Sequence, residues 1–202
     1  YRGQRPPEDI LRDIPRLNKL LASKGIKAPV IFTEWGYHTS DKGINEDTQA
    51  AYVVRSFLIA SSVRMPFSIW YNWQELGDDS NDAQQKYGLI RDGSVDASDD
   101  DTKKPAFFAL KQLNTLLAGY RYDKTLHNSN GMFCIRFKKG SDVAYAAWTT
   151  TKNSAPYQLA LPKGQWRTKE IMGNANIIAV NDIHPATLQL QSMPLIVMPV
   201  SN

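Results

Sequence analysis

The hydrophobic pattern of this chain changes its period close to Tyr122, and this change constrains the fold more than any other feature. Before it, segments of helical spacing alternate with short continuous apolar runs, in the order helix, strand, helix, strand, helix. After it, apolar and polar residues alternate in short segments broken by Gly, Pro and Asn. The first pattern predicts right-handed βαβ units around a parallel sheet, and the second predicts an all-β sandwich. We therefore expect two domains, residues 1–120 and 121–202.

Three amphipathic helices are expected in the first of these domains. Residues 7–24 carry apolar side chains at three- and four-residue spacings, with Pro15 inside, which predicts a kink or a late start. A second helix is expected after Asn45, a good N-cap residue. A third is expected to begin at Pro105 and to end near Gly119.

Two strands are expected between these helices, in "PVIFTEW" at 29–35 and "PFSIWYNW" at 66–73. Their apolar runs are continuous, which predicts strands buried on both faces, as in a parallel sheet. Residues 74–104 form a stretch too long for a simple connection, so we expect a functional lid or an insertion there.

Composition excludes several functional classes. The net charge of +4 and the isoelectric point near 9.1 come from scattered Lys and Arg, so no nucleic-acid partner is expected. No apolar run reaches the length of a membrane span. The start "YRGQRPPEDI" has neither Met nor a signal-peptide core, so we expect the chain to begin inside a longer protein. Three histidines without metal-ligand spacing predict no metal site, and Cys134 in an alternating segment is expected to be a buried small hydrophobe.

Four motifs resemble the C-terminal part of a clan A glycoside hydrolase, with family 39 or family 5 as the nearest branches. They are "PVIFTEWGY" at 29, "SIWYNWQE" at 68, "YGLIRDG" at 87 with "KKPAFFAL" at 104, and the closing "MGNANIIAVNDIHPATLQLQSMPLIVMP". The resemblance implies the last strands of a (β/α)8 TIM barrel followed by a small β-sandwich. It also implies a secreted or periplasmic retaining hydrolase that cleaves β-linked poly- or oligosaccharides without a cofactor.

The strand ends supply the candidate site residues. Ligands in such barrels bind at the C-terminal strand ends, where Glu34 would fall, and the resemblance makes Glu34 the nucleophile. A retaining enzyme needs a second carboxyl group about 5 to 5.5 Å away. The alternative is that Glu34 is a capping or salt-bridged acid. Five further residues are candidates for substrate contact, with Trp70 as the sugar platform or a core residue: Trp35, Tyr37, His38, Trp70 and Asn72.

The chain departs from the family pattern in one respect. The proton-donating Glu of the fourth barrel strand has no counterpart, so the N-terminal half of the barrel would have to supply it. The competing interpretations are a non-catalytic carbohydrate-binding or scaffold protein with a degenerate barrel, and an inactive fragment. In the long loop, Glu75 and the acidic residues Asp78, Asp79 and Asp82 are expected to be solvated.

Overall fold

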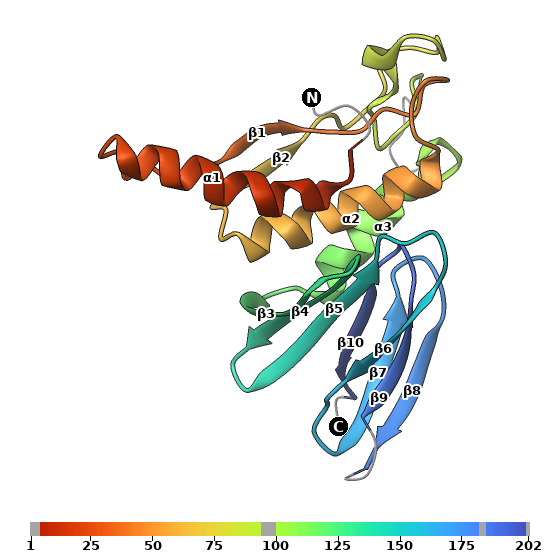
Figure 1. The fold of residues 1–202 in the computed structure, drawn as a ribbon. Helices are drawn as coiled ribbons and strands as arrows, with labels where there is room; N and C mark the ends of the chain where they lie inside the picture. The colour runs from red at the N-terminus through yellow and green to blue at the C-terminus, as the bar shows by residue number, and fades with distance from the viewer. Residues whose placement is uncertain (1–4, 94–99, 182–184, 201–202) are drawn as a thin grey trace. The chain divides into compact units, whose positions relative to one another are not determined.

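The computed structural model describes residues 5–93, 100–181 and 185–200 of the chain (Figure 1). It divides into two compact units, residues 1–110 and 111–202, which we describe separately. His184 and the first part of the acidic run that begins at Asp96 lie outside the described residues.

Unit 1 opens with the 3-10 turn η1 (Pro7–Asp9), which leads into helix α1 (Ile10–Ser23). The helix continues through Pro15, and Gly25 follows its end with φ 71°. The predicted helix is confirmed, but its buried stripe is shorter than predicted. Ile10 and Ile14 are buried, whereas later stripe residues such as Leu20 are exposed, because the second half of the helix has little within unit 1 to pack against.

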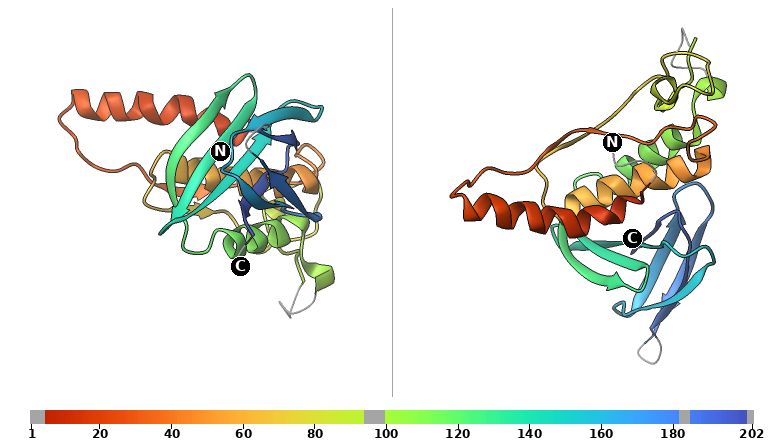
Figure 2. Two further views of the ribbon diagram at one scale, coloured as in Figure 1. Left: turned by 90° about the horizontal axis from the view of Figure 1, so that it is seen from below. Right: turned by 45° about the horizontal axis from the view of Figure 1, so that its top comes forward.

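A βαβ unit follows, made of strand β1 (Phe32–Trp35), helix α2 (Glu46–Ser62) and strand β2 (Ser68–Trp70). The strands pair in parallel, as predicted. Asn45 caps α2, since its side chain accepts a hydrogen bond from the backbone N–H of Thr48 at 2.8 Å. Figures 1 and 2 show α1 and α2 on the same side of the β1–β2 pair.

The prediction that both strands are buried on two faces is wrong. Ile31 is 37% exposed, and Phe67 and Ile69 are each 51% exposed. The reason is that β1 and β2 pair only with each other in the described chain, so no further strand flanks them. Both strands are also shorter than the apolar runs that contain them.

Short elements occur in the described part of the long stretch after β2. It contains the 3-10 turns η2 (Ala83–Lys86) and η3 (Asp100–Thr102), and isolated β-bridges join Ile90 to Gln74 and Lys103. Helix α3 (Pro105–Leu116) follows, and Gly119 comes after its end with φ 78°, as predicted.

Unit 2 begins within α3, and the rest of its regular structure is antiparallel strands. Its six-stranded sheet has the order β3-β4-β5-β10-β7-β8, and a two-stranded sheet pairs β6 with β9. The strand bounds are β3 Arg121–Ser129, β4 Met132–Lys139, β5 Asp142–Thr149, β6 Ala155–Leu159, β7 Gly164–Glu170, β8 Ala175–Val180, β9 Ala186–Leu190 and β10 Leu195–Pro199. Strands β4 and β5 form an antiparallel hairpin, and Gly140 occupies its turn with φ 60°.

Both sheets of unit 2 contribute to one hydrophobic core. Tyr145 and Trp166 come from the large sheet and Leu188 from the small one. Trp148 lies on the opposite face of β5 from Tyr145, as the alternation predicts, and its ring stacks on Phe133 at 5.2 Å between centroids. A fully buried Trp148 therefore does not present its ring as a sugar platform.

Candidate active site

The parallel pairing of β1 and β2 brings the two predicted strand ends together. Trp35 pairs with Trp70, and the backbone N–H of Tyr71 donates to the carbonyl oxygen of Trp35 at 2.9 Å. The segments that follow both strands therefore start from one edge of the sheet. This edge is the C-terminal one, where parallel α/β folds bind their ligands.

Glu34 lies in a β-bulge at this edge. Phe32 pairs with Ser68 and Trp35 pairs with Trp70, so β1 has one more residue than β2 between the two pairs. Bulges occur near active sites, where they redirect a side chain out of the regular alternation. The Glu34 side chain is exposed, whereas its neighbour Trp35 is 7% exposed.

Trp35 and Tyr37 lie in the core of unit 1. The indole N–H of Trp35 donates to the hydroxyl of Tyr37 at 3.4 Å, and the Tyr37 ring packs edge-on against Tyr52 of α2 at 4.8 Å. Burial raises the pKa of Tyr37 above its ordinary value, so the phenol stays protonated at neutral pH. The Tyr37 and Trp70 ring centroids are 6.1 Å apart, which places Tyr37 as packing support for Trp70.

His38 is partly buried next to this aromatic group. Its Nδ1 lies 2.8 Å from the hydroxyl oxygen of Ser40, and its ring meets Tyr87 edge-on at 5.3 Å. Burial lowers the pKa of His38, which favours the neutral imidazole at pH 7. A neutral imidazole can exchange hydrogen bonds with a ligand without placing a positive charge beside it.

Trp70 and Asn72 carry polar atoms without a partner. The indole nitrogen of Trp70 and the side-chain oxygen of Asn72 are both buried, and neither has a hydrogen-bond partner within the described part of the chain. Leaving a buried polar group unsatisfied costs about 1–3 kcal/mol. One atom is a donor and the other an acceptor, which is the combination that a hydroxyl group satisfies.

Gly36 fixes the approach of the two strand ends. A Cβ atom on Gly36 would lie 2.0 Å from the carbonyl oxygen of Tyr71. Gly36 is not among the described glycines with positive φ, so no left-handed turn requires a glycine here. Its role is close backbone contact between the β1 and β2 ends.

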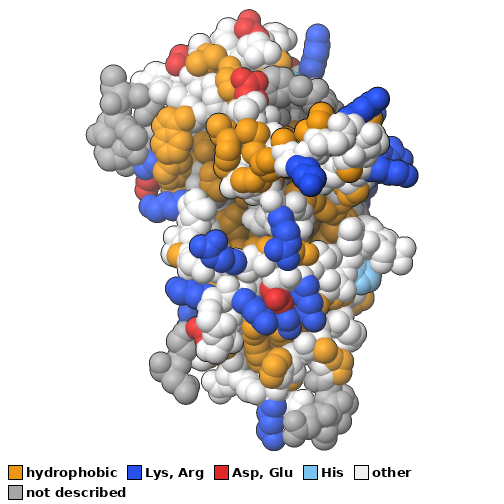
Figure 3. Space-filling view, turned by 90° about the vertical axis from the view of Figure 1, so that its left-hand side faces the viewer, with side chains coloured by type: hydrophobic (Ala, Val, Ile, Leu, Met, Phe, Trp, Pro, Cys, Tyr) orange, Lys and Arg blue, Asp and Glu red, His pale blue; other side chains and the backbone are white. Residues whose placement is uncertain are grey.

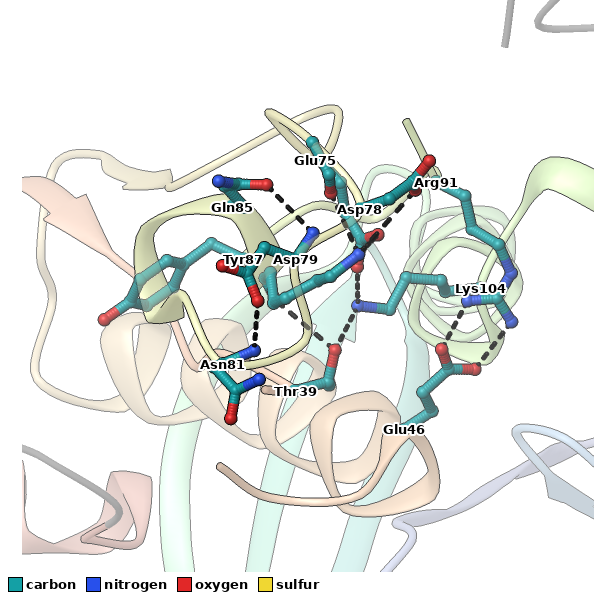
Figure 4. A network of polar contacts seen from close by, with 12 residues as sticks. Thr39, Glu46, Glu75, Asp78, Asp79, Asn81, Gln85, Tyr87, Arg91 and Lys104 are labelled. Carbon is teal, nitrogen blue, oxygen red and sulfur yellow. Dashed lines mark hydrogen bonds and ion pairs between the residues drawn. The ribbon is translucent and has the colours of Figure 1, made fainter. Parts of the chain in front are cut away.

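A network of charged residues connects the loops that follow β1 and β2 (Figure 4), and sequence reasoning did not predict it. Glu75 is 5% exposed, so the expectation that it is solvated is wrong. Its carboxylate accepts from the fully buried Lys104 ammonium at 2.8 Å and from Lys86 at 3.1 Å. Lys104 also donates to the hydroxyl of Thr39 at 2.7 Å, and burial lowers the pKa of Lys104. These four residues join the loop after β1 to the loop after β2 and to the start of α3.

One signal in the sequence could have revealed this network. Lys103 and Lys104 directly precede Pro105, the first residue of α3, and no acid occupies the first turn of that helix. A cation at a helix N-terminus is unfavourable with respect to the helix dipole, so a nearby carboxylate is expected. The sequence alone does not tell which carboxylate it is.

A second ion pair holds the middle of the stretch 74–104. The guanidinium of Arg91 forms a fork with Glu46 at the start of α2, and one of its bonds is 2.9 Å long. The hydrogen bond from Arg91 holds the pKa of Glu46 below its ordinary value. This contact fixes residues 90–91 against α2.

The acidic loop residues make local hydrogen bonds. Asp79 accepts from the backbone N–H of Asn81, and Asp82 accepts from that of Gln84, each at 2.9 Å. Within the described ranges no group of three His, Cys, Asp or Glu side chains is placed to hold a metal ion. Over the same ranges no helix is both long and apolar enough to cross a membrane.

Comparison with known proteins relates the fold, but not the sequence, to glycoside hydrolases. No family model and no curated protein matches the chain. A family 39 glycoside hydrolase from the gut symbiont Bacteroides cellulosilyticus WH2 is similar in structure, with a TM-score of 0.73, 24% identity, 88% of this chain covered and 35% of that one. A GH30 endoxylanase from Clostridium papyrosolvens C71 has a TM-score of 0.55 and 13% identity, over 91% of this chain and 45% of that one.

A third similar structure is a conserved exported protein from Bacteroides fragilis, with a TM-score of 0.54 and 12% identity. The match covers 91% of this chain and 41% of that protein. The chain thus spans between about a third and a half of the length of these three proteins. At such identities the similarity shows a glycoside-hydrolase-like fold and leaves substrate and mechanism open.

Proposed function

We propose that this chain is the C-terminal part of a retaining O-glycoside hydrolase that cleaves β-linked poly- or oligosaccharides. In this proposal unit 1 contributes the last strands of a (β/α)8 barrel, and unit 2 is its accessory β-sandwich. The observation that carries the proposal is the exposed Glu34 in a bulge at the C-terminal edge of a parallel strand pair, on a fold similar to a family 39 glycoside hydrolase.

The exposed apolar surface of the strands supports the barrel assignment. Strands of a closed barrel have a neighbour on both sides, and parallel sheets are normally buried on both faces. Ile31, Phe67 and Ile69 instead present apolar surface that further strands would cover. The missing N-terminal half of the barrel is therefore the protein partner that we propose for this unit.

Double displacement assigns a role to Glu34. Its carboxylate attacks the anomeric carbon and forms a covalent glycosyl ester, while a carboxylic acid from the N-terminal half protonates the departing oxygen. Water then attacks the ester with that second residue as the base. Both the leaving group and the proton are accounted for without a metal or a cofactor.

Trp70 and Asn72 supply the sugar contacts in this proposal. Sugar hydroxyl groups accept from the indole N–H of Trp70 and donate to the side-chain oxygen of Asn72, two atoms without a partner in the described chain. The apolar face of the sugar ring stacks on the Trp70 indole. Trp35 and Tyr37 hold the floor of the site, and the neutral His38 exchanges a hydrogen bond with a second hydroxyl.

The proposal is tested by replacement of Glu34 in the complete protein. Glu34→Gln removes the nucleophile and keeps the side-chain volume, so turnover of a β-glycoside should fall by more than about a thousandfold. Asp47→Asn is the matched control, because Asp47 is an exposed acid in the first turn of α2. Azide added to Glu34→Gly should restore turnover and give a product of inverted configuration.

Two results would contradict the proposal. Glu34→Gln could retain a substantial fraction of the turnover, or azide could give no inverted product. A complete protein that binds β-glycans but turns over none of them would instead support a carbohydrate-binding or scaffold function. The proposed secreted or periplasmic location is checked by cell fractionation, where the protein should leave the cytoplasm.

A further inference from the structure

The net charge of +4 conceals a strong asymmetry between the two units. Residues 111–202 contain ten Lys and Arg and four Asp and Glu, a formal charge of +6. Residues 1–110 contain fourteen Lys and Arg and sixteen Asp and Glu, a formal charge of −2. The interpretation that the net charge comes from Lys and Arg scattered along the chain is thus corrected, because the positive excess belongs to unit 2.

Part of this excess forms two cross-strand pairs of like charge. Arg121 on β3 lies opposite Lys138 on β4, and Lys124 lies opposite Arg136. Opposed residues of an antiparallel pair share one face of the sheet, so these four cations, which we call the basic face, lie together. Figure 3 shows a cluster of Lys and Arg side chains around a single acidic side chain.

Asp123 is the acid that the strand geometry places within the basic face. A bulge in β3 inserts it between the two cross-strand pairs. Arg136 donates to its carboxylate at 2.6 Å, and Lys138 approaches it at 3.7 Å. Within the described ranges Arg121 and Lys124 have no ion pair of this kind, and both are exposed.

Like charges opposite each other destabilise a sheet, so the basic face is kept at a cost to the fold. One carboxylate against four cations leaves three positive charges to be balanced from outside. The Cβ atoms of opposed residues lie about 5 Å apart across the strands, and those of successive residues on one face lie about 7 Å apart along a strand. A polymer with closely repeated negative groups fits such a ladder, and arginine forks match planar carboxylates and sulfates.

We propose that the basic face of unit 2 binds an anionic polysaccharide, a chain of sugars that carry carboxylate or sulfate groups. This inference rests on the proposed glycosidase function, and it names the substrate class that unit 2 would hold. Single-stranded nucleic acids bind on aromatic rings set among basic residues. The basic face offers none, because Tyr122 lies on the opposite side of β3 and Tyr145 is buried.

The test is affinity electrophoresis of the full chain through gels that contain one polymer each. Polygalacturonate provides carboxylates and dextran sulfate provides sulfates, whereas fully methyl-esterified polygalacturonate and dextran are the neutral controls. A triple variant with Arg121→Gln, Lys124→Gln and Lys138→Gln removes three charges from the basic face. The matched control replaces Lys19, Lys24 and Lys27 of unit 1, which are also exposed, so both variants have a net charge of +1.

The wild-type chain should be retarded by at least one anionic polymer and by neither neutral one. The basic-face variant should bind at least about tenfold more weakly, whereas the control variant should change less than about threefold. Retardation should weaken at high salt, since exposed charges are screened. Far-ultraviolet circular dichroism checks that both variants are folded.

Three results would overturn the inference: equal losses in the two variants, equal binding of the esterified polymer, or tighter binding to a DNA oligonucleotide than to both anionic polysaccharides. Whichever anionic polymer binds identifies the group that is recognised. The Glu34→Gln variant separates the two proposals, because it should lose turnover and keep this binding. Failure of the binding test alone would leave the glycosidase proposal intact.

Discussion

The ion pair between Glu75 and Lys104 should dominate the stability of the loops after β1 and β2. Lys104 is fully buried and Glu75 is 5% exposed, so removal of either partner strands a charge away from water. Glu75→Leu leaves the Lys104 ammonium with only the Thr39 hydroxyl, and such a change destabilises a fold by about 3–5 kcal/mol. Lys104→Met should cost about 1–3 kcal/mol, because Glu75 keeps its bond to Lys86.

The double variant distinguishes a stranded charge from lost packing. With both partners apolar, no uncompensated charge remains at their site, so Glu75→Leu with Lys104→Met should be more stable than Glu75→Leu alone. Lys86 retains its bond to the carbonyl of Gly77 at 2.9 Å and is partly exposed, so its contribution to the loss is small.

The assay is urea unfolding combined with hydrogen exchange on peptides of unit 1. The backbone N–H of Thr39, bonded to Lys86, and that of Lys104, bonded to Leu89, report directly on the loops. Asp13→Asn is the control, because Asp13 pairs with the exposed Arg12 on α1 and the loss of this pair should cost less than about 1 kcal/mol. Single-variant losses that simply add in the double variant would refute the reasoning.

Three further predictions concern single residues. Gly36→Ala should destabilise unit 1 by more than about 2 kcal/mol in urea unfolding, because the added Cβ would lie 2.0 Å from the Tyr71 carbonyl oxygen. A loss no larger than that of Gly25→Ala, whose added Cβ meets no atom within 4 Å, would contradict this. Cys134 should resist iodoacetamide at pH 8 until urea is added, because burial raises the pKa of its thiol to about 12. Rapid alkylation of Cys134 in the folded chain would count against this prediction. Because the pKa of His38 is lower in the folded chain than in the unfolded chain, the unfolded chain takes up the proton at higher pH, and the free energy of unfolding should fall as the pH drops below about 6.5. His38→Asn should flatten this pH dependence, and an unchanged slope would argue against the reasoning.

The order of elements in unit 1 could be predicted because its signals are local. The helical spacing before Lys24, the cap at Asn45 and the proline at the start of α3 each act within a few residues. The burial of β1 and β2 could not be predicted in this way. It depends on what covers a strand, and an apolar run does not show whether a neighbour is present.

In the candidate site too, features set by local sequence could be predicted, and features set by distant contacts could not. The juxtaposition of Glu34 with Trp70 followed from the parallel pairing of two apolar runs. The bulge and the close approach at Gly36 require the register of the strands, which their composition does not reveal. Glu75 was misjudged because its partners lie 11 and 29 residues away, beyond any local pattern.

The most direct test of the central claim is covalent trapping on Glu34. The complete protein would be incubated with a panel of 2-deoxy-2-fluoro-β-glycosides, which slow the hydrolysis of the glycosyl ester, and then digested for mass spectrometry. We expect one added fluorosugar on the peptide that contains Glu34, and none in the Glu34→Gln variant. A fluorosugar attached to another carboxylate, or turnover of a β-glycoside with no labelled Glu34, would contradict it.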